Sequence, residues 1–145
     1  ALKNIIALAS GMSTGMGYGD NTRAMLITRG IAEMTRMGLA MGCKRRTFMG
    51  LAGIGDLIVT CTSQHSRNNR CGEYIGRGMT YKEASEKVGM VVEGYYALEA
   101  AVELSRKYGE PLPIISAVYD VVMNGRKPED ALDALMTRAM RSELD

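Results

Sequence analysis

Apolar residues recur with helical spacing along most of this chain. The first such group has spacings of three and four positions: Leu2, Ile5, Ile6 and Ala9. It predicts a first helix that ends in the segment Gly11 to Gly19, which holds too many glycines for a helix interior. The stretch from Gly11 to Asp20 is therefore expected to be a loop. A second helix, buried at the centre of the fold, is expected from the capping residues Asp20 or Asn21 to about Met41.

Three short helices are predicted in the middle of the chain. The first two are expected to span Thr47 to Gly53 and Leu57 to Thr62, with the glycine-rich turn between them. Ser66 is a suitable N-cap for the third, which continues to about Gly76.

The remaining third of the chain carries clear signals for helix ends. Thr80 and Glu83 have the spacing of a capping box, which places a helix at about Tyr81 to Val88, and Gly89 ends it. Three further helices are expected: Tyr95 to Tyr108, Ile114 to about Asn124, and a last one that starts at Pro128. Strand-like alternation is nearly absent, so the predicted fold class is all-α, as a single multi-helix domain.

Composition excludes several classes of function. The chain has 145 residues, 46% of them hydrophobic and 23% charged, which suits one globular domain with a substantial core. A formal net charge of +2 without a long basic run gives no reason to expect nucleic acid as a partner. No apolar run reaches the ~18 residues of a membrane helix, so membrane insertion is not expected.

The cysteines and the histidine do not have metal-ligand spacing. Cys43, Cys61 and Cys71 lack a CxxC pattern, and His65 has no neighbouring pair of metal ligands, so no metal is predicted. Three unpaired cysteines fit free thiols in a reducing compartment, and we expect a cytoplasmic protein.

The most informative stretch runs from Gly50 to Arg70 and reads GLAGIGDLIVTCTSQHSRNNR. Three glycines precede Asp56, which could simply cap the apolar helical turn that follows. Farther along, Ser66, Arg67 and Asn68 combine a hydroxyl N-cap, a guanidinium and an amide at a helix start. These groups suit an anion, and phosphate in particular, although a solvated helix start is the simpler interpretation of the same residues.

This stretch resembles the signature of the NAD(P)-dependent glycerol-3-phosphate dehydrogenases. Two further segments, ALKNIIALASG and GYGDNTRAMLITRGIAEMTRMG, are similar to that family and lie in the same order and spacing. The resemblance covers nearly the whole chain but only the C-terminal half of such an enzyme. It implies that residues 1–145 form a helical substrate-binding domain resembling the C-terminal domain of 6-phosphogluconate dehydrogenase-like proteins.

The dinucleotide fingerprint GxGxxG does not follow any strand-like run in this chain. The resemblance therefore implies that the N-terminal Rossmann domain, which would bind most of the NAD or NADP, is absent from it. The first residues also enter a helical pattern directly, without an initial methionine, as expected for a chain cut out of a longer one.

Individual roles follow from the resemblance. It makes Lys3 the general acid/base, whereas composition alone would make it an ordinary exposed lysine. It assigns the substrate to six residues: Asn4, Asp56, Thr60, Ser66, Arg67 and Asn68. It assigns cofactor contacts to Arg67, Val91 and Glu93, of which Glu93 would otherwise be a surface carboxylate.

The implied reaction interconverts dihydroxyacetone phosphate and sn-glycerol 3-phosphate with NAD(P)H, for glycerophospholipid biosynthesis. The implied partners are a small phosphorylated three-carbon substrate, the N-terminal Rossmann domain and, as one option for the oligomeric state, a second copy in a homodimer. Without the nucleotide-binding half, the chain alone is predicted to be inactive. Its sequence leaves open the choice between NAD and NADP and any feedback regulation.

Two other interpretations remain open at this point. One is the helical half of a related dehydrogenase for another substrate, and the other is a non-catalytic helical interaction module whose glycines serve packing only. Convergence of Lys3, Asp56 and Arg67 on one open site would favour an enzyme, whereas separate faces would favour the interaction module.

Overall fold

The structure, a computed structural model, describes residues 2–42, 51–63 and 66–144. Within these ranges it is built from helices and contains no strand, so the predicted all-α fold class is confirmed. The helices are α1 (Leu2–Gly15), α2 (Asp20–Ala40), α4 (Leu51–Thr62), α5 (Arg67–Gly76), α6 (Tyr81–Val88), α7 (Glu93–Tyr108), α8 (Pro113–Asn124) and α9 (Pro128–Leu144).

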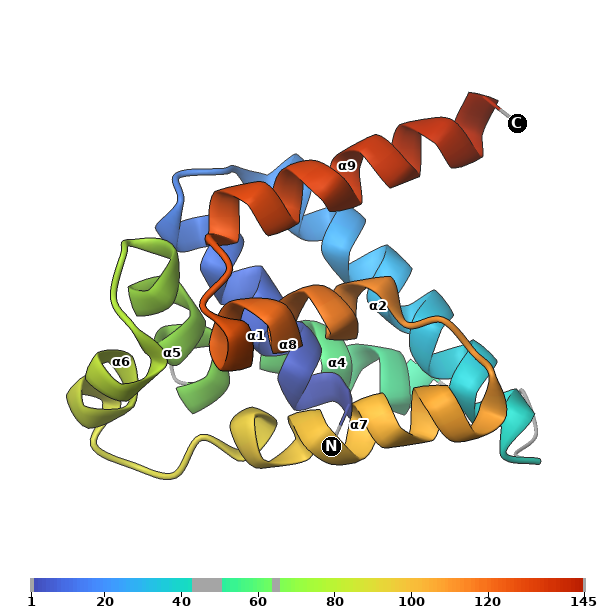
Figure 1. Cartoon of the computed structure of the whole chain (residues 1–145), viewed down its shortest axis with the longest axis horizontal. Coiled ribbons are helices and arrows are strands. Elements are labelled where there is room, and N and C mark those ends of the chain that lie inside the picture. Colours follow the sequence, from blue (N-terminus) through green and yellow to red (C-terminus); the bar gives the residue numbers. More distant parts are fainter. Residues whose placement is uncertain (1, 43–50, 64–65, 145) are drawn as a thin grey trace.

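Helix α1 is the centre of the fold. It runs through the middle of the molecule, with α5 and α6 on one side, α2 on the other and α9 across the top (Figure 1). Every residue from Ile5 to Ser13 is buried, and α1 packs against α2, α4, α5, α7 and α8. A helix that is apolar or small on all sides belongs in the interior. The prediction that the second helix would be the central one was therefore wrong.

The contact between α1 and α5 brings two backbones together. Four glycines line it: Gly11, Gly15, Gly72 and Gly76. A methyl group at Gly11 would lie 2.0 Å from the carbonyl oxygen of Asn69, and one at Gly72 would lie 2.2 Å from that of Leu8. The first helix consequently continues past Gly11, where a loop was predicted, because these glycines permit close packing that offsets their low helix propensity.

The predicted caps of the short helices are confirmed. The Ser66 hydroxyl accepts a hydrogen bond from the Asn69 backbone N–H at 3.3 Å and caps α5. Thr80 and Glu83 form both hydrogen bonds of a capping box at the start of α6. Gly89 ends α6 with a φ of 72°, a left-handed conformation that glycine adopts without strain.

Other helix boundaries differ from the predictions. The N-cap of α2 is Gly19, and Asp20 lies instead in the first turn, where it accepts a hydrogen bond from Arg23. Helix α4 is continuous from Leu51 through the glycines that were expected to interrupt it. Cys43, His65 and residues 44–50, including most of the first predicted short helix, lie outside the described residues.

In the part of the chain that the structure describes, no helix combines the length and apolar character needed to cross a membrane.

Candidate active site

Lys3 and Asp56 form an ion pair between α1 and α4. The Lys3 Nζ lies 2.5 Å from the Asp56 Oδ2, and the two side chains are 38% and 55% exposed. Asp56 is the sixth residue of α4, so the N-cap interpretation of this aspartate was wrong. Thr60 follows one turn later on α4 and is partly buried. The ion pair therefore presents an ammonium and a carboxylate together on an open surface.

The start of α5 offers hydrogen-bond donors to solvent. Ser66 is the N-cap, and its hydroxyl accepts from the Asn69 backbone N–H while its own hydrogen stays available to donate. Arg67 is the first residue of α5 and is exposed. Backbone N–H groups in a first helical turn have no partner within the helix, and the helix dipole makes this end attractive to anions. The start of α5 thus has the chemistry of an anion site.

Asn68 has a different place from its two neighbours. Its side chain is 7% exposed, and its Oδ1 accepts a hydrogen bond from the Gly94 backbone N–H at 2.8 Å. The carbonyl end of this amide is therefore used to fix the start of α7 against the start of α5. Only the NH₂ end of Asn68 remains as a donor for a ligand.

The start of α7 also contacts α1. The Glu93 Oε2 accepts a hydrogen bond from the Asn4 Nδ2 at 3.1 Å. A methyl group at Gly94 would lie 2.8 Å from the Asn68 Oδ1 and 2.9 Å from the Asn4 carbonyl oxygen. Three helix starts therefore meet at Gly94, and they carry Lys3 and Asn4, Ser66 to Asn68, and Glu93. Val91, just before α7, is 59% exposed.

These contacts connect most of the residues singled out in the sequence. Lys3 pairs with Asp56, Asn4 with Glu93, and Asn68 with the N–H of Gly94. Arg67 and Ser66 are joined to this group by their chain position beside Asn68. Thr60 lies on α4 one turn after Asp56, and Val91 lies two residues before the start of α7, so each is placed near the group by its position in the chain. The arrangement combines a positioned amine, an anion-binding helix start and two carboxylates.

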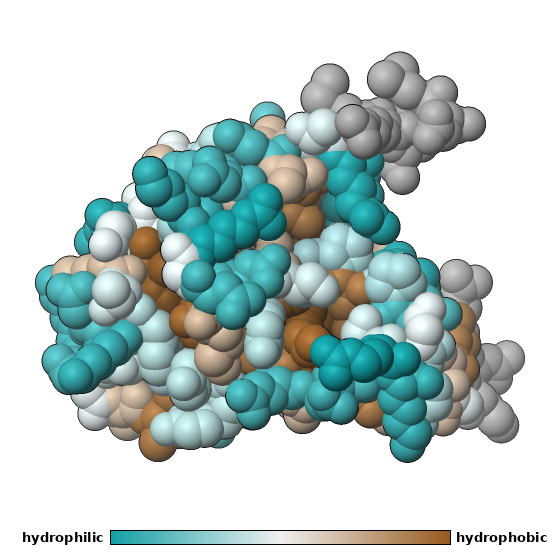
Figure 2. Space-filling view, in the orientation of Figure 1, coloured by the Kyte–Doolittle hydropathy of each residue, from teal (hydrophilic) through white to brown (hydrophobic). Residues whose placement is uncertain are grey.

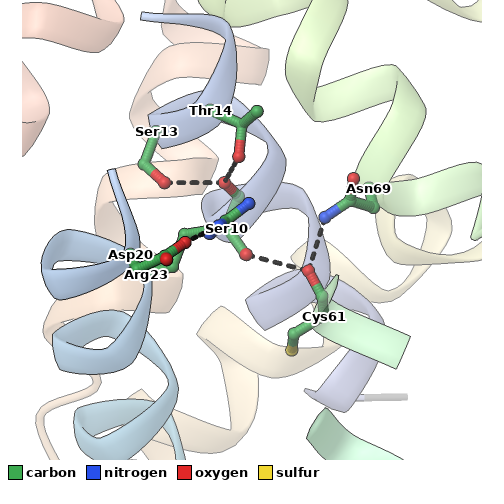
Figure 3. Close-up of polar contacts among 7 residues, drawn as sticks. All are labelled: Ser10, Ser13, Thr14, Asp20, Arg23, Cys61 and Asn69. Atoms are coloured by element: carbon green, nitrogen blue, oxygen red, sulfur yellow. Dashed lines mark hydrogen bonds and ion pairs between the residues drawn. The ribbon is translucent and has the colours of Figure 1, made fainter. Parts of the chain in front are cut away.

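The backbone of α4 is held by a hydrogen-bond network that the sequence did not indicate (Figure 3). The Cys61 carbonyl oxygen accepts from the Ser10 Oγ at 2.8 Å and from the Asn69 Nδ2 at 2.5 Å. Ser10 is fully buried and Asn69 is 5% exposed. Because Cys61 lies at the end of α4, these two donors fix the helix that carries Asp56 against both α1 and α5. Ser10 is a polar residue in an apolar stretch and Asn69 is one polar residue among several, so neither carries a sequence signal for this contact.

The two described cysteines, Cys61 and Cys71, are free, as predicted, and both are buried. Burial raises the pKa of each thiol to about 12. A thiol with such a pKa is protonated at neutral pH and is a poor nucleophile, so neither cysteine contributes covalent chemistry to this site.

Comparison with known proteins shows a consistent set of relatives. Residues 1–133 match the family described as NAD-dependent glycerol-3-phosphate dehydrogenase C-terminus. The chain is 54% identical, over all 145 residues, to a glycerol-3-phosphate dehydrogenase (NAD(P)+) of Geobacillus kaustophilus, and covers 42% of that protein. It is 55% identical over 143 residues to the protein of the same name from Clostridium perfringens, of which it covers 43%.

Solved structures share the fold. The crystal structure of glycerol-3-phosphate dehydrogenase from Coxiella burnetii superposes on 93% of this chain and 42% of its own, with a TM-score of 0.90 and 40% identity. The glycerol-3-phosphate dehydrogenase structure from Saccharomyces cerevisiae covers 92% of this chain and 39% of its own, with a TM-score of 0.82 and 28% identity. The chain therefore spans about two fifths of the length of the relatives it matches, and its fold is that of the 6-phosphogluconate dehydrogenase-like helical domains.

Proposed function

This chain belongs to the family of NAD-dependent glycerol-3-phosphate dehydrogenase C-termini, and from that premise we propose that it is the substrate-binding half of such an oxidoreductase. The proposed reaction interconverts dihydroxyacetone phosphate and sn-glycerol 3-phosphate with NAD(P)H. The observation that supports it most directly is the meeting of an amine, a carboxylate and an anion-binding helix start. These groups come from α1, α4 and α5: the Lys3–Asp56 ion pair joins α1 to α4, and the contacts at the start of α7 join α1 to α5.

The phosphate of the substrate would bind at the start of α5. Arg67 can grip a phosphate with two parallel N–H donors, and the Ser66 hydroxyl and the NH₂ of Asn68 add neutral donors. The exposure of Arg67 and the α5 helix dipole support this assignment. The phosphate does not react, so its binding energy serves to orient the carbonyl end of the molecule.

Lys3 would move the proton of the reaction. Reduction of the ketone needs a proton on the carbonyl oxygen, which the Lys3 ammonium donates, and in the reverse direction the amine accepts the proton of the hydroxyl. When bound, the nicotinamide supplies the hydride in reduction and accepts it in oxidation. Asp56 holds the Lys3 side chain by its 2.5 Å contact, and Thr60, on the same face of α4, would donate to a substrate oxygen.

The start of α7 fits a cofactor contact. One carboxylate oxygen of Glu93 is bonded to Asn4, and the other is available for the hydroxyl or amide donors that a nicotinamide dinucleotide carries. Val91 presents apolar surface beside it, being 59% exposed. Arg67, close in sequence to the buried Asn68 that contacts Gly94, would add a cationic donor. These residues would complete a pocket of which the Rossmann domain forms the larger part.

The remaining parts of the proposal concern partners. The N-terminal Rossmann domain of the same enzyme would cover the exposed apolar residues near the site, which include Val59 at 62%, Val91 at 59% and Tyr96 at 70% exposure. We place the enzyme in the cytoplasm and expect a homodimer, which sedimentation of the complete enzyme would test. Residues 1–145 alone are expected to lack dehydrogenase activity.

A chimeric enzyme tests the proposed function. It joins the part of the Geobacillus kaustophilus relative that precedes the matched region to residues 1–145, which are 54% identical to the segment they replace. We expect this chimeric enzyme to oxidise NADH only when dihydroxyacetone phosphate is present, and residues 1–145 alone to show no such activity. The intact relative is the positive control.

Two outcomes would contradict the proposal. A folded chimeric enzyme that ignores dihydroxyacetone phosphate but reduces another carbonyl compound would identify a related dehydrogenase with a different substrate. A folded chimeric enzyme that turns over no carbonyl compound, with residues 1–145 unable to bind sn-glycerol 3-phosphate in calorimetry, would favour an interaction module.

A further inference from the structure

A cleft away from the candidate active site lies between α2, the α7–α8 connection, α8 and α9. It has a volume of about 290 Å³ and shares no residue with the candidate active site. Figure 2 shows the molecule hollowed below the outer half of α9, the region where these elements face one another (Figure 1). Its volume lies at the lower end of the range for ligand pockets and is sufficient for a small anion.

Three arginines line this cleft: Arg29, Arg36 and Arg138. Arg36 is partly engaged, because it donates to the Pro111 carbonyl at 3.3 Å and has Glu110 at 4.0 Å. Arg29, on α2, and Arg138, on α9, form no ion pair with any residue of the described ranges. Two guanidiniums from different helices thus line one small space, and neither forms an ion pair with its two carboxylates, Glu33 and Glu110.

Two acidic residues line the cleft, and both already have partners: Glu110 lies 4.0 Å from Arg36, and Glu33 is bonded to the backbone. Glu33 is 2% exposed, and its two oxygens accept from the backbone N–H groups of Ile114 at 2.6 Å and Ile115 at 3.4 Å. Glu33 therefore supplies the hydrogen-bond acceptors for the free backbone N–H groups in the first turn of α8. Burial raises the pKa of Glu33 to about 7. The two backbone N–H groups and the charges of Arg36 and Arg138 act in the opposite direction, but their effect is smaller. Near neutral pH a fraction of Glu33 is uncharged, which leaves the cleft more positive than its formal charges suggest.

We propose that this cleft binds a small doubly charged anion, held between Arg29 and Arg138. The ligand class is an oxyanion or a short dicarboxylate, because a planar guanidinium pairs with two oxygens of one anionic group. Arg36 contributes a third positive charge from one turn beyond Glu33. A bound anion bridges α2 and α9, and it stabilises the folded chain by an amount that grows with the logarithm of the anion concentration above Kd.

Sulfate is the probe for this site, because it stays doubly charged across the pH range of interest. Calorimetry is carried out on residues 1–145 carrying Arg67→Gln, which weakens the other anion site, with chloride used to keep the ionic strength constant. We expect saturable sulfate binding that weakens about tenfold or more in Arg29→Gln and in Arg138→Gln. Arg106→Gln is the matched control, since Arg106 is an exposed arginine of α7 outside the cleft, paired with Glu103 at 2.9 Å; it should bind sulfate unchanged.

The pH dependence of binding gives a readout that a purely structural role of the arginines would not change. The charged groups around Glu33 are Arg29 and Arg36 on α2, Glu110 before α8, and Arg138 on α9. A dianion beside Glu33 disfavours its charged form, so sulfate affinity should rise as pH falls from 8 to 6, and Glu33→Gln should remove this rise.

Absence of saturable sulfate binding at constant ionic strength would overturn the proposal. So would equal affinity in the two arginine variants and the unmutated background. If a variant does not fold, NMR of the folded Arg67→Gln protein provides the test. Sulfate should then change the backbone amide signals of Arg29, Ile114 and Arg138. Changes confined to other residues would contradict the proposed site.

Discussion

The Lys3 Nζ lies 2.5 Å from the Asp56 Oδ2, although 53 positions of sequence separate the two residues. The contact depends on the buried α1, on which Lys3 occupies the first turn, and on the attachment of α4 through the Cys61 carbonyl. It places the proposed acid/base beside a group that can orient it. The exposed ion pair itself adds little to stability.

Asp56→Asn should therefore show that Asp56 serves to orient the Lys3 ammonium and contributes little to the stability of the fold. In the chimeric enzyme we expect kcat to fall by about 10- to 100-fold, because Lys3 loses the charge that holds its ammonium in place. The free energy of unfolding should change by less than about 1 kcal/mol. Glu103→Gln, which breaks the exposed ion pair with Arg106, is the control and should leave both quantities unchanged. An equal kcat in Asp56→Asn and Glu103→Gln would contradict the role of Asp56.

Arg67→Ala tests the phosphate site. Loss of a charged hydrogen-bonding partner should remove about 1.5–3 kcal/mol of transition-state stabilisation. This corresponds to a fall in kcat/KM for dihydroxyacetone phosphate of about 10- to 150-fold. Arg77→Ala is the matched control, because Arg77 lies at the other end of α5 and pairs with Glu73 at 2.6 Å on the surface. Steady-state kinetics that show the same kcat/KM for both variants would remove Arg67 from the site.

The glycine contact between α1 and α5 should be sensitive to a single methyl group. Gly11→Ala would place a carbon 2.0 Å from the Asn69 carbonyl oxygen, and the facing backbone must move to relieve it. Urea unfolding should show a loss of about 1–3 kcal/mol or more. Gly55→Ala, at an exposed position of α4 with no atom within 4 Å, should instead gain up to about 1 kcal/mol from helix propensity. Equal unfolding free energies for the two variants would refute the close contact.

Glu33 makes stability depend on pH in a defined direction. Its pKa in the folded chain is about 7, above the usual value of 4.5, so folding favours its protonated form. The resulting stabilisation is fully present below pH 4.5 and is lost as pH rises through 7. Between pH 5 and pH 8 the free energy of unfolding should fall by about 2–3 kcal/mol more in the unmutated chain than in Glu33→Gln. Urea unfolding at several pH values measures this. The same change in unfolding free energy with pH for both proteins would contradict the raised pKa of Glu33.

Local signals in the sequence were sufficient for much of the helix pattern. Ser66, the pair Thr80 and Glu83, and Gly89 form their hydrogen bonds within three or four residues, so their spacing alone predicts the caps. Gly11 was misread as the start of a loop because its packing partner is the backbone of Asn69, on a helix 58 positions away by residue number. Nothing in the local sequence distinguishes a glycine that a facing helix requires from one that a turn requires.

The candidate site could likewise be predicted only in part from the sequence. A resemblance to known proteins pointed to Lys3, Asp56 and Arg67, whereas the contacts that hold their helices in place could not be predicted from the sequence. Ser10 and Asn69 act on a backbone carbonyl 51 and 8 positions away, and Asn68 fixes a backbone N–H 26 positions away. Such contacts depend on tertiary packing, and a polar residue does not reveal in advance which distant backbone group it will meet.

The most direct test of the proposed mechanism is the turnover of the chimeric enzyme carrying Lys3→Met, which keeps the length of the side chain and removes its proton. With dihydroxyacetone phosphate and NADH at saturation, we expect kcat to fall by about 10²- to 10⁴-fold while the KM for dihydroxyacetone phosphate changes little. A Lys3→Met enzyme that keeps kcat within a few-fold of the unmutated chimera would contradict the assignment of Lys3 as the acid/base, and with it the central claim made for this site.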